Sequence, residues 1–364
     1  MQFLLAHHPF QVHIDFEPVR LAVSEGVQIY SQMNTGDWWW DSQDQLPARA
    51  TIVPVICASN KTHLTHFSCD HHTWLHYLTI GNTRKDICCT LKTHAWIHLC
   101  LILCSPKCAK NIHAAWHSLV GTVLCQLSHP EITGPSMKCD WADGCQRQCY
   151  PLLAACVRDY TQQMMLAQGS YGSCPISEIP KAAPMGHSTF PQLDYSRDQH
   201  IYSELLGDNN IDVQHTLGVR PIHNQFWQYP FCNVNRLWQP DKLHQLLIAL
   251  VKELLHWLLK YLNARNVKNQ CDNRFTSVPR YPCLQHFSQS FDSLNSATWQ
   301  GNEIPGMIRT LAVNCTPILN YPKDDGNIEA GNSSDEIVMG VLRTLYELSL
   351  LVTNKITRVY PSKH

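Results

Sequence analysis

The chain has 364 residues, 44% of them hydrophobic, with 28 basic and 29 acidic side chains and a formal net charge of −1. This length suffices for one large α/β domain or two ordinary domains with a sizeable core. The neutral balance, without any Lys/Arg-rich run, argues against a broad basic surface for nucleic acid, so any DNA contact must be local.

Cysteine and histidine are abundant, with 17 and 21 residues. The first ten residues, MQFLLAHHPF, lack the basic segment, apolar core and cleavage site of a secretory signal. The longest apolar stretch, residues 95–104, is about half as long as a membrane span requires. We therefore expect a soluble intracellular chain with reduced thiols and no membrane association.

The N-terminal half shows strand patterns after an uninformative start. GDWWWDSQDQLP (36–47) predicts a short helix or turn. Three segments rich in β-branched and aromatic residues predict the strands of a mixed sheet: 51–57, 74–80 and 95–103. The first of them leads into an expected polar turn at Ser59-Asn60-Lys61.

Helical patterns dominate the rest of the chain. Residues 110–126 and 149–166 read as helices, the second with Pro151 in its first turn. Residues 168–200 are rich in Pro, Ser and Gly and predict a linker. Leucines at three- and four-residue spacing predict a helix over 240–262, and a Ser-Ser cap followed by acids predicts another over 335–356.

A zinc site around Cys100, Cys104 and Cys108 has little support. Structural zinc sites usually use C-x2-C pairs, and the chain contains none. A spacing of four gathers side chains on a helix, whereas this composition favours a strand. We interpret these residues as small buried thiols, with a zinc-binding module as the least favoured alternative.

Four acids lie inside or at the ends of well-patterned elements: Asp143, Asp159, Asp241 and Glu253. Two-metal phosphoryl chemistry needs several carboxylates, because Mg²⁺ demands oxygen ligands and their negative charge offsets two close cations. Taken singly, each acid is more typical of a solvated or helix-capping group. The local patterns therefore leave the choice open.

Several blocks in the same order resemble the core of the Plavaka transposases of mushroom-forming fungi, relatives of the CACTA-type cut-and-paste elements. They include GDWWWDSQDQLP, ATIVPVICASNKTHLTHF, HYLTIGNTRKDI, CDWADGCQRQCYPLLAACVRDY, LGVRPIHNQFWQ and QPDKLHQLLIALVKELLHW. The resemblance spans roughly residues 36 to 356.

The resemblance implies an α/β fold, namely a ribonuclease-H-like mixed sheet with flanking helices, a helical insertion and a C-terminal helical part. It suggests an unassigned segment at 1–35, the first part of the core at 36–167, a linker or insertion at 168–215, and the remaining, mostly helical core at 216–364. Such a core binds Mg²⁺ or Mn²⁺ and cleaves and joins DNA at transposon ends in the nucleus.

The resemblance also assigns the site. The first acid belongs at Asn60, where the family has the Asp of an ASDKT block. Asp159 is the preferred second acid and Asp143 its rival, while Asp241 and Glu253 are candidates for the third. The implied metal ligands are therefore Asp159 with Asp241 or Glu253.

Asn60 predicts a site with impaired metal binding, because an amide carbonyl can contact a metal but lacks the charge that holds two cations close together. We therefore expect a degenerate, inactive transposase fragment that binds no metal now. The alternatives are a residual nuclease in which Asp70 substitutes at position 60, and a non-catalytic DNA-binding or interaction module. The oligomeric state stays open.

Other departures from the family are the change of FSGDK to FSCDH (67–71) and the loss of arginines. An Arg-Arg pair appears as Cys88-Cys89, and an Arg-rich stretch as CQRQC (145–149). C-to-T mutation on either DNA strand would leave Cys or Gln in place of Arg, a hypothesis that fails if these codons are not one transition from Arg codons. Lost arginines remove phosphate contacts, so we expect weak DNA binding.

Overall fold

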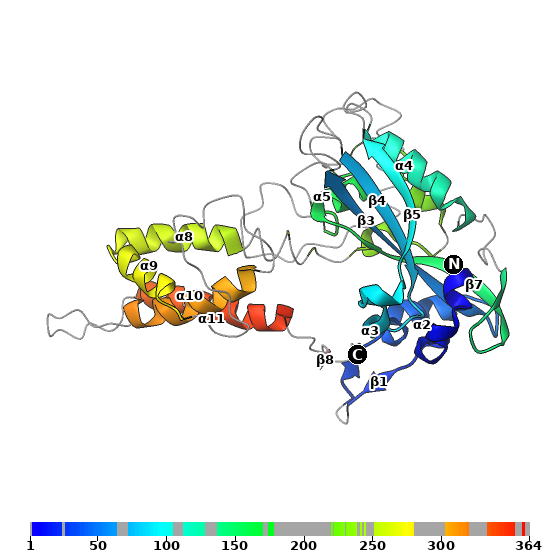
Figure 1. Ribbon diagram of the computed structural model, residues 1–364, viewed down its shortest axis with the longest axis horizontal. Helices are drawn as coiled ribbons and strands as arrows, with labels where there is room; N and C mark the ends of the chain where they lie inside the picture. Colours follow the sequence, from blue (N-terminus) through cyan, green and yellow to red (C-terminus); the bar gives the residue numbers. More distant parts are fainter. Residues whose placement is uncertain are drawn as a thin grey trace. The chain divides into compact units, whose positions relative to one another are not determined.

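The three segments predicted as strands belong to a five-stranded mixed sheet in the computed structural model (Figure 1). The chain divides by its internal contacts into a first unit, Met1–Gln239 with Thr357–His364, and a second unit, Pro240–Ile356. The structure describes residues 2–23, 26–63, 72–104, 112–127, 137–169, 174–177, 220, 222–229, 231–238, 241, 244, 251–279, 303–319, 333–353 and 359–360.

The sheet has the strand order β5-β4-β3-β7-β6. Its strands are β3 (Thr51–His63), β4 (His72–Ile80), β5 (Ile97–Cys104), β6 (Met137–Asp140) and β7 (Gln146–Val157). β4 pairs antiparallel with β3 and with β5, β6 pairs antiparallel with β7, and β3 runs parallel to β7. A parallel pair needs a crossover connection, and the chain between β5 and β7 includes helix α4 (Ile112–Val123).

One face of the sheet carries the largest hydrophobic core. Val53, Val55 and Cys57 of β3 are buried there, in the two-residue period expected of a strand with a covered face. Trp116 and Val120 of α4 belong to the same core. Further residues come from two short 3₁₀ helices, η6 (Gln225–Gln228) and η7 (Val234–Arg236).

The other face of the sheet packs against α2 (Asp37–Gln43). The tryptophan-rich segment, expected to form a short helix or turn, is therefore helical. Trp39 is fully buried and clusters with Ile52 of β3 and Leu152 of β7. Asp37 lies in the first turn of the helix, where a negative charge is favourable.

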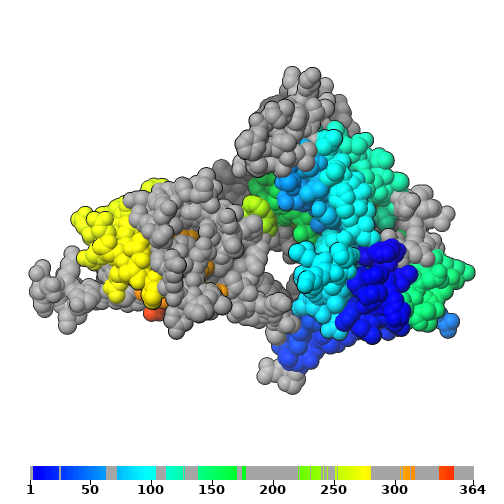
Figure 2. Space-filling view, viewed as in Figure 1, coloured from blue at the N-terminus to red at the C-terminus, as the bar shows by residue number. Residues whose placement is uncertain are grey.

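The N-terminal residues support the β6–β7 hairpin. The hairpin residue Ala142 donates its N–H to the Leu5 carbonyl of α1 (Gln2–Leu5) at 2.9 Å. In Figure 2 these residues, in dark blue, lie beside the green hairpin. The other elements of the first unit are η1 (His8–His13), β1 (Leu21–Ala22), β2 (Gln28–Ile29), η2 (Met33–Thr35), α3 (Lys85–Cys88), η3 (Leu91–Thr93), η5 (Cys125–Leu127), α5 (Tyr160–Leu166) and β8 (Val359–Tyr360).

The three predicted strands and the helix at 110–126 are confirmed, but the helix predicted over 149–166 is wrong. Its first half is strand β7, and only its last turns are helical, as α5. Residues 149–153 of β7 are all buried, with Leu153 in one hydrophobic core and Leu152 in another, so this apolar run has neither a clean two-residue nor a clean helical period. Pro151 fits the strand because pairing with β6 ends at Cys149, so no β6 hydrogen bond needs its missing N–H.

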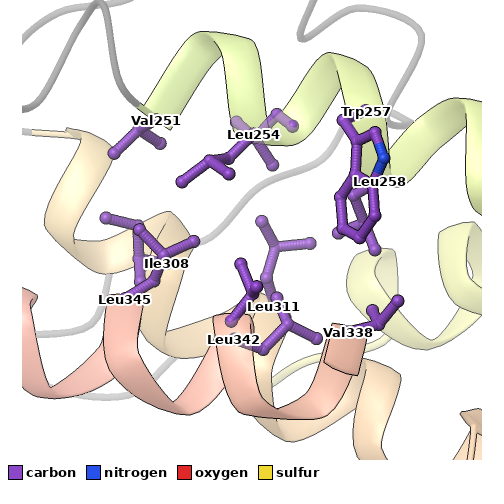
Figure 3. Close-up of a pocket in the computed structure, with 11 residues that line it drawn as sticks. Val251, Leu254, Trp257, Leu258, Ile308, Leu311, Val338, Leu342 and Leu345 are labelled. Atoms are coloured by element: carbon purple, nitrogen blue, oxygen red, sulfur yellow. The ribbon is translucent and has the colours of Figure 1, made fainter. Parts of the chain in front are cut away.

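The second unit is helical in its described residues. It contains α8 (Val251–Ala264), α9 (Lys268–Thr276), α10 (Glu303–Leu319) and α11 (Ser333–Thr353). The predicted helix at 335–356 is confirmed as α11. The predicted helix at 240–262 is confirmed from Val251 onward, and most of its earlier residues lie outside the described ranges. Figure 3 shows leucine-rich faces of α8, α10 and α11 around one apolar pocket.

No helix in the described part of the chain is both long and apolar enough to cross a membrane. The predicted linker at 168–200 lies almost wholly outside the described residues, so the expected domain boundaries remain predictions.

Candidate functional site

The two leading site positions, Asn60 and Asp159, lie at the same edge of the sheet. The parallel pairing of β3 and β7 ends at Ala58 opposite Val157. Each candidate follows its strand's last paired residue by two positions. Because neighbouring parallel strands end at a common edge, the fold brings together two residues about a hundred positions apart in sequence.

Asn60 belongs to strand β3, which continues to His63, so the polar turn expected at residues 59–61 is wrong. The strand extends because its pairing with β4 continues beyond the end of β7, with Asn60 opposite Leu75. Ser59 is buried and Asn60 is exposed, as alternation along a strand requires. Position 60 therefore presents its side chain to the surface.

Asp159 begins helix α5 as its N-cap residue. Its Oδ1 accepts hydrogen bonds from the Gln162 N–H and the Thr161 hydroxyl, both at 2.8 Å. The cap satisfies a backbone donor that the first turn leaves unpaired. Both contacts fall on Oδ1, and the residue is half-exposed.

Arg158, directly before Asp159, is an unusual neighbour that sequence reasoning did not single out. It is 6% exposed, and its guanidinium carbon lies 4.7 Å from the centre of the Trp116 ring. Its guanidinium nitrogens have no oxygen or nitrogen hydrogen-bond partner among the described residues, and the Cys156 thiol is a weak hydrogen-bonding group beside them. Burial, and secondarily the charge of Arg158, lowers the pKa of His76 to about 3. His76 is therefore neutral at physiological pH, and the core beside the candidate site carries one desolvated positive charge.

The thiols beneath this edge are inert. Cys57, Cys156 and Cys232 are buried, and burial raises the pKa of each thiol. A protonated, enclosed thiol is neither a nucleophile nor a ready metal ligand. These residues pack as small apolar side chains.

Asp143 occupies the opposite end of the sheet, in the turn between β6 and β7. β7 separates it from Asp159 by roughly 35 Å, given the usual rise per strand residue. Its two oxygens accept hydrogen bonds of 2.8 and 2.6 Å from Arg147. These hydrogen bonds lower the pKa of the Asp143 carboxyl. Asp143 therefore cannot share a site with Asn60, and among the two candidates for the second acid the geometry leaves Asp159.

The candidates for the third acid belong to the second unit. Asp241 Oδ2 lies 2.5 Å from Nδ1 of His244, and its Oδ1 accepts the His244 N–H at 3.1 Å. Glu253 is exposed in the first turn of α8. Their place in a common site with Asp159 stays a prediction.

The donor set at the sheet edge is poor for a cation. Among the described residues, no three His, Cys, Asp or Glu side chains form a group that could hold a metal ion. One exposed amide and one carboxylate that caps a helix carry too little negative charge for two divalent ions. The residues described at this edge thus do not fit a two-metal site.

The hypothesis that C-to-T mutation replaced arginines fits some positions of the structure better than others. Cys89, Cys145 and Gln146 are exposed, so an arginine would be solvated there. Cys149, in contrast, is fully buried, and its sulfur accepts the Trp141 indole N–H at 3.2 Å. An arginine at Cys149 would be buried, so this cysteine is better explained by packing. Residues 67–71 lie outside the described part of the chain.

Comparison with known proteins gives one clear finding. A search of curated proteins returns no match. The family model for the Plavaka transposase matches residues 1–258, which is more than half of the chain and includes all five candidate site residues. The chain therefore belongs to the Plavaka transposase family and is a DNA-transposase-derived protein.

Proposed function

We propose that this protein is a degenerate ribonuclease-H-like transposase core that has lost DNA strand cleavage through the amide at position 60. The observation that carries the proposal is the common edge of β3 and β7, where Asn60 and Asp159 each lie two residues beyond the last paired residue of their strand. A cleavage site built on that edge would need a carboxylate from each strand.

The sheet supports the proposed fold. Three antiparallel strands are followed by a helix, by the short strand β6 and then by β7, which runs parallel to the first strand; the spatial order is β5-β4-β3-β7-β6. Apart from β6, this is the arrangement expected of the first part of a ribonuclease-H-like core. Helices on both faces of the sheet, α4 and α2, agree with it.

Missing negative charge at position 60 is the reason for the proposed loss of activity. Two divalent ions held 3.5–4 Å apart, roughly the spacing of two-metal sites, repel each other unless several carboxylates surround them. Asn60 provides none of that charge, and Asp159 provides one unit. We therefore assign no catalytic step to the chain as it stands.

DNA binding is proposed to be weak. The chain has one more acidic than basic side chain, 29 against 28. Phosphate contacts supply most sequence-independent affinity, and each lost arginine removes one potential contact. A retained DNA-binding module would show measurable affinity at low salt that falls steeply as salt rises.

A nicking assay tests the proposal. Duplex DNA is incubated with Mg²⁺ or Mn²⁺ and either the natural chain, Asn60→Asp, or Asn60→Asp combined with Asp159→Asn. We expect no nicking by the natural chain, nicking by Asn60→Asp, and its loss in the double variant.

Each other outcome has a definite meaning. Equal nicking by the natural chain and Asn60→Asp would instead support a residual nuclease, in which another acid such as Asp70 replaces position 60. No nicking by any variant, together with salt-dependent DNA binding, would favour a non-catalytic binding module.

A further inference from the structure

The side chain of Gln162 links the two halves of the candidate site. Gln162 lies in the first turn of α5 and is 1% exposed. With its amide oriented to satisfy its partners, Nε2 donates to the Ser59 carbonyl at 3.2 Å and to the Ser59 Oγ at 2.6 Å, and Oε1 accepts the Lys61 N–H at 2.9 Å. The amide therefore contacts the backbone on both sides of Asn60.

This geometry reproduces a step of the parallel ladder. In such a ladder, one residue bonds to the carbonyl before and the N–H after its partner on the next strand. β7 stops pairing at Val157, yet the Gln162 amide makes both of these bonds around position 60. The side chain thus extends the sheet by one residue where the strand itself has ended.

The same residue also holds Asp159. Its backbone N–H donates to Asp159 Oδ1 at 2.8 Å. Gln162 is thereby bonded both to the Asp159 carboxylate and to the backbone that flanks Asn60, by its main chain and side chain respectively. On the other side, β4 fixes position 60 through the pairing with Leu75.

We propose that Gln162 is a positioning residue that holds position 60 in register with Asp159. The inference rests on the proposed function for its chemical purpose, because the ancestral site that this function assumes would have needed carboxylates at positions 60 and 159 in fixed register. Groups that orient ligands from behind typically change metal affinity or activity 10–100-fold when removed.

Gln162→Met tests the link because it keeps the side-chain length and removes the amide. Gln43→Met is the matched control, since Gln43 Nε2 donates to the Ala50 carbonyl at 2.9 Å beside the opposite end of β3. We expect amide hydrogen exchange at Lys61 to accelerate at least about 10-fold in Gln162→Met and to change less than about twofold in Gln43→Met, given that the lost bond is local. Unchanged exchange at Lys61 overturns the inference.

Gln162→Glu provides a second variant should the methionine chain fold poorly. It keeps the oxygen that accepts the Lys61 N–H but cannot donate to Ser59, so Lys61 is expected to stay protected. Fast exchange at Lys61 in a folded Gln162→Glu chain would contradict the role assigned to Oε1.

Mn²⁺ titration by calorimetry connects the link to the proposed function. In the Asn60→Asp background, Gln162→Met is expected to weaken Mn²⁺ binding about 10-fold or more, and Gln43→Met is expected to leave it unchanged. Equal Mn²⁺ affinity with and without Gln162→Met overturns the inference. An Asn60→Asp chain that binds no Mn²⁺ while Lys61 exchange still responds to Gln162→Met counts against the proposed function and supports the link.

Discussion

The two ends of the central sheet differ in how their charged side chains are paired. At the β6–β7 turn, Asp143 and Arg147 form two hydrogen bonds of 2.8 and 2.6 Å, so both charges are paired. At the end where β3 and β7 finish, Arg158 is buried without an oxygen or nitrogen hydrogen-bond partner among the described residues, and the next residue, Asp159, caps a helix.

The difference separates a structural end from a candidate functional end. Paired charges around a turn stabilise local geometry and leave little for a ligand to add. Unpaired polar groups in a buried setting cost free energy, and such costs tend to concentrate where a fold once served chemistry. Variants at the two ends test whether this difference in charge pairing affects stability.

The largest effect is expected at Trp116, which is 1% exposed and packs between Arg158 and Phe226. Trp116→Ala is expected to lower the free energy of unfolding by about 3–5 kcal/mol, because it leaves a large cavity in the core. Urea denaturation followed by circular dichroism measures the change.

Phenylalanine substitutions at both ends serve as controls. Trp116→Phe should cost clearly less than Trp116→Ala, because a phenyl ring fills much of the space of the indole and the lost N–H has no partner among the described residues. Trp141→Phe should cost more, since the Trp141 N–H donates to Cys149. Equal costs for the two would contradict the contrast between the ends.

The two arginines should respond with opposite signs. Arg158→Met is expected to raise the free energy of unfolding by about 1–3 kcal/mol, because it removes a buried charge that has no oxygen or nitrogen hydrogen-bond partner among the described residues. Arg147→Met is expected to lower it by about 1–2 kcal/mol, because Asp143 loses two charge-assisted hydrogen bonds. Both are measured by urea denaturation at pH 7. Destabilisation by Arg158→Met would show that this guanidinium is stabilised in the folded chain.

The pH dependence of stability should also differ between the two ends. Burial lowers the pKa of His76 to about 3 and that of His117 to about 4, from an ordinary value of 6.5. Below pH 6.5 the unfolded chain binds protons that the folded chain does not. Stability is thus fully present above pH 6.5 and is lost on acidification, with a slope approaching about 1.4 kcal/mol per pH unit for each histidine.

The Asp143 end should respond only at lower pH. Its hydrogen bonds to Arg147 lower the pKa of the carboxyl below the ordinary 3.8, so its contribution is present above that value and is lost as pH falls further. Replacing His76 and His117 with Gln should flatten the slope between pH 6.5 and 4 and leave the acid loss below 3.8. An unaltered slope in urea titrations would rule out these histidines as its source.

Local patterns in the sequence predicted the helices and strands better than they predicted which of them lie side by side. Residues 51–57 and 74–80 combine β-branched and aromatic side chains with flanking turns, so their strands were predictable. β7 was not, because a strand buried on both sides has no surface to impose a two-residue period. The polar run Ser59-Asn60-Lys61 suggested a turn, although pairing with β4 keeps it extended.

The candidate site depended on information that spacing does not contain. Asn60 and Asp159 meet because two distant strands pair in parallel, and only the family resemblance suggested both positions. Gln162 and Arg158 were missed since an amide that replaces a strand residue, or a cation that lacks a partner, has no local sequence signal. A glutamine three residues after an N-cap was the one available hint, and it is common in helices.

β8 has a consequence for dividing the chain. Val359 and Tyr360 pair with Ile29 and Gln28, so the last described residues belong to the first unit. The helical unit is therefore an excursion that the polypeptide enters once and leaves once. Cutting the chain after Gln239 would therefore remove β8 from the three-stranded sheet β1-β2-β8, although the cut falls at the boundary between the two units.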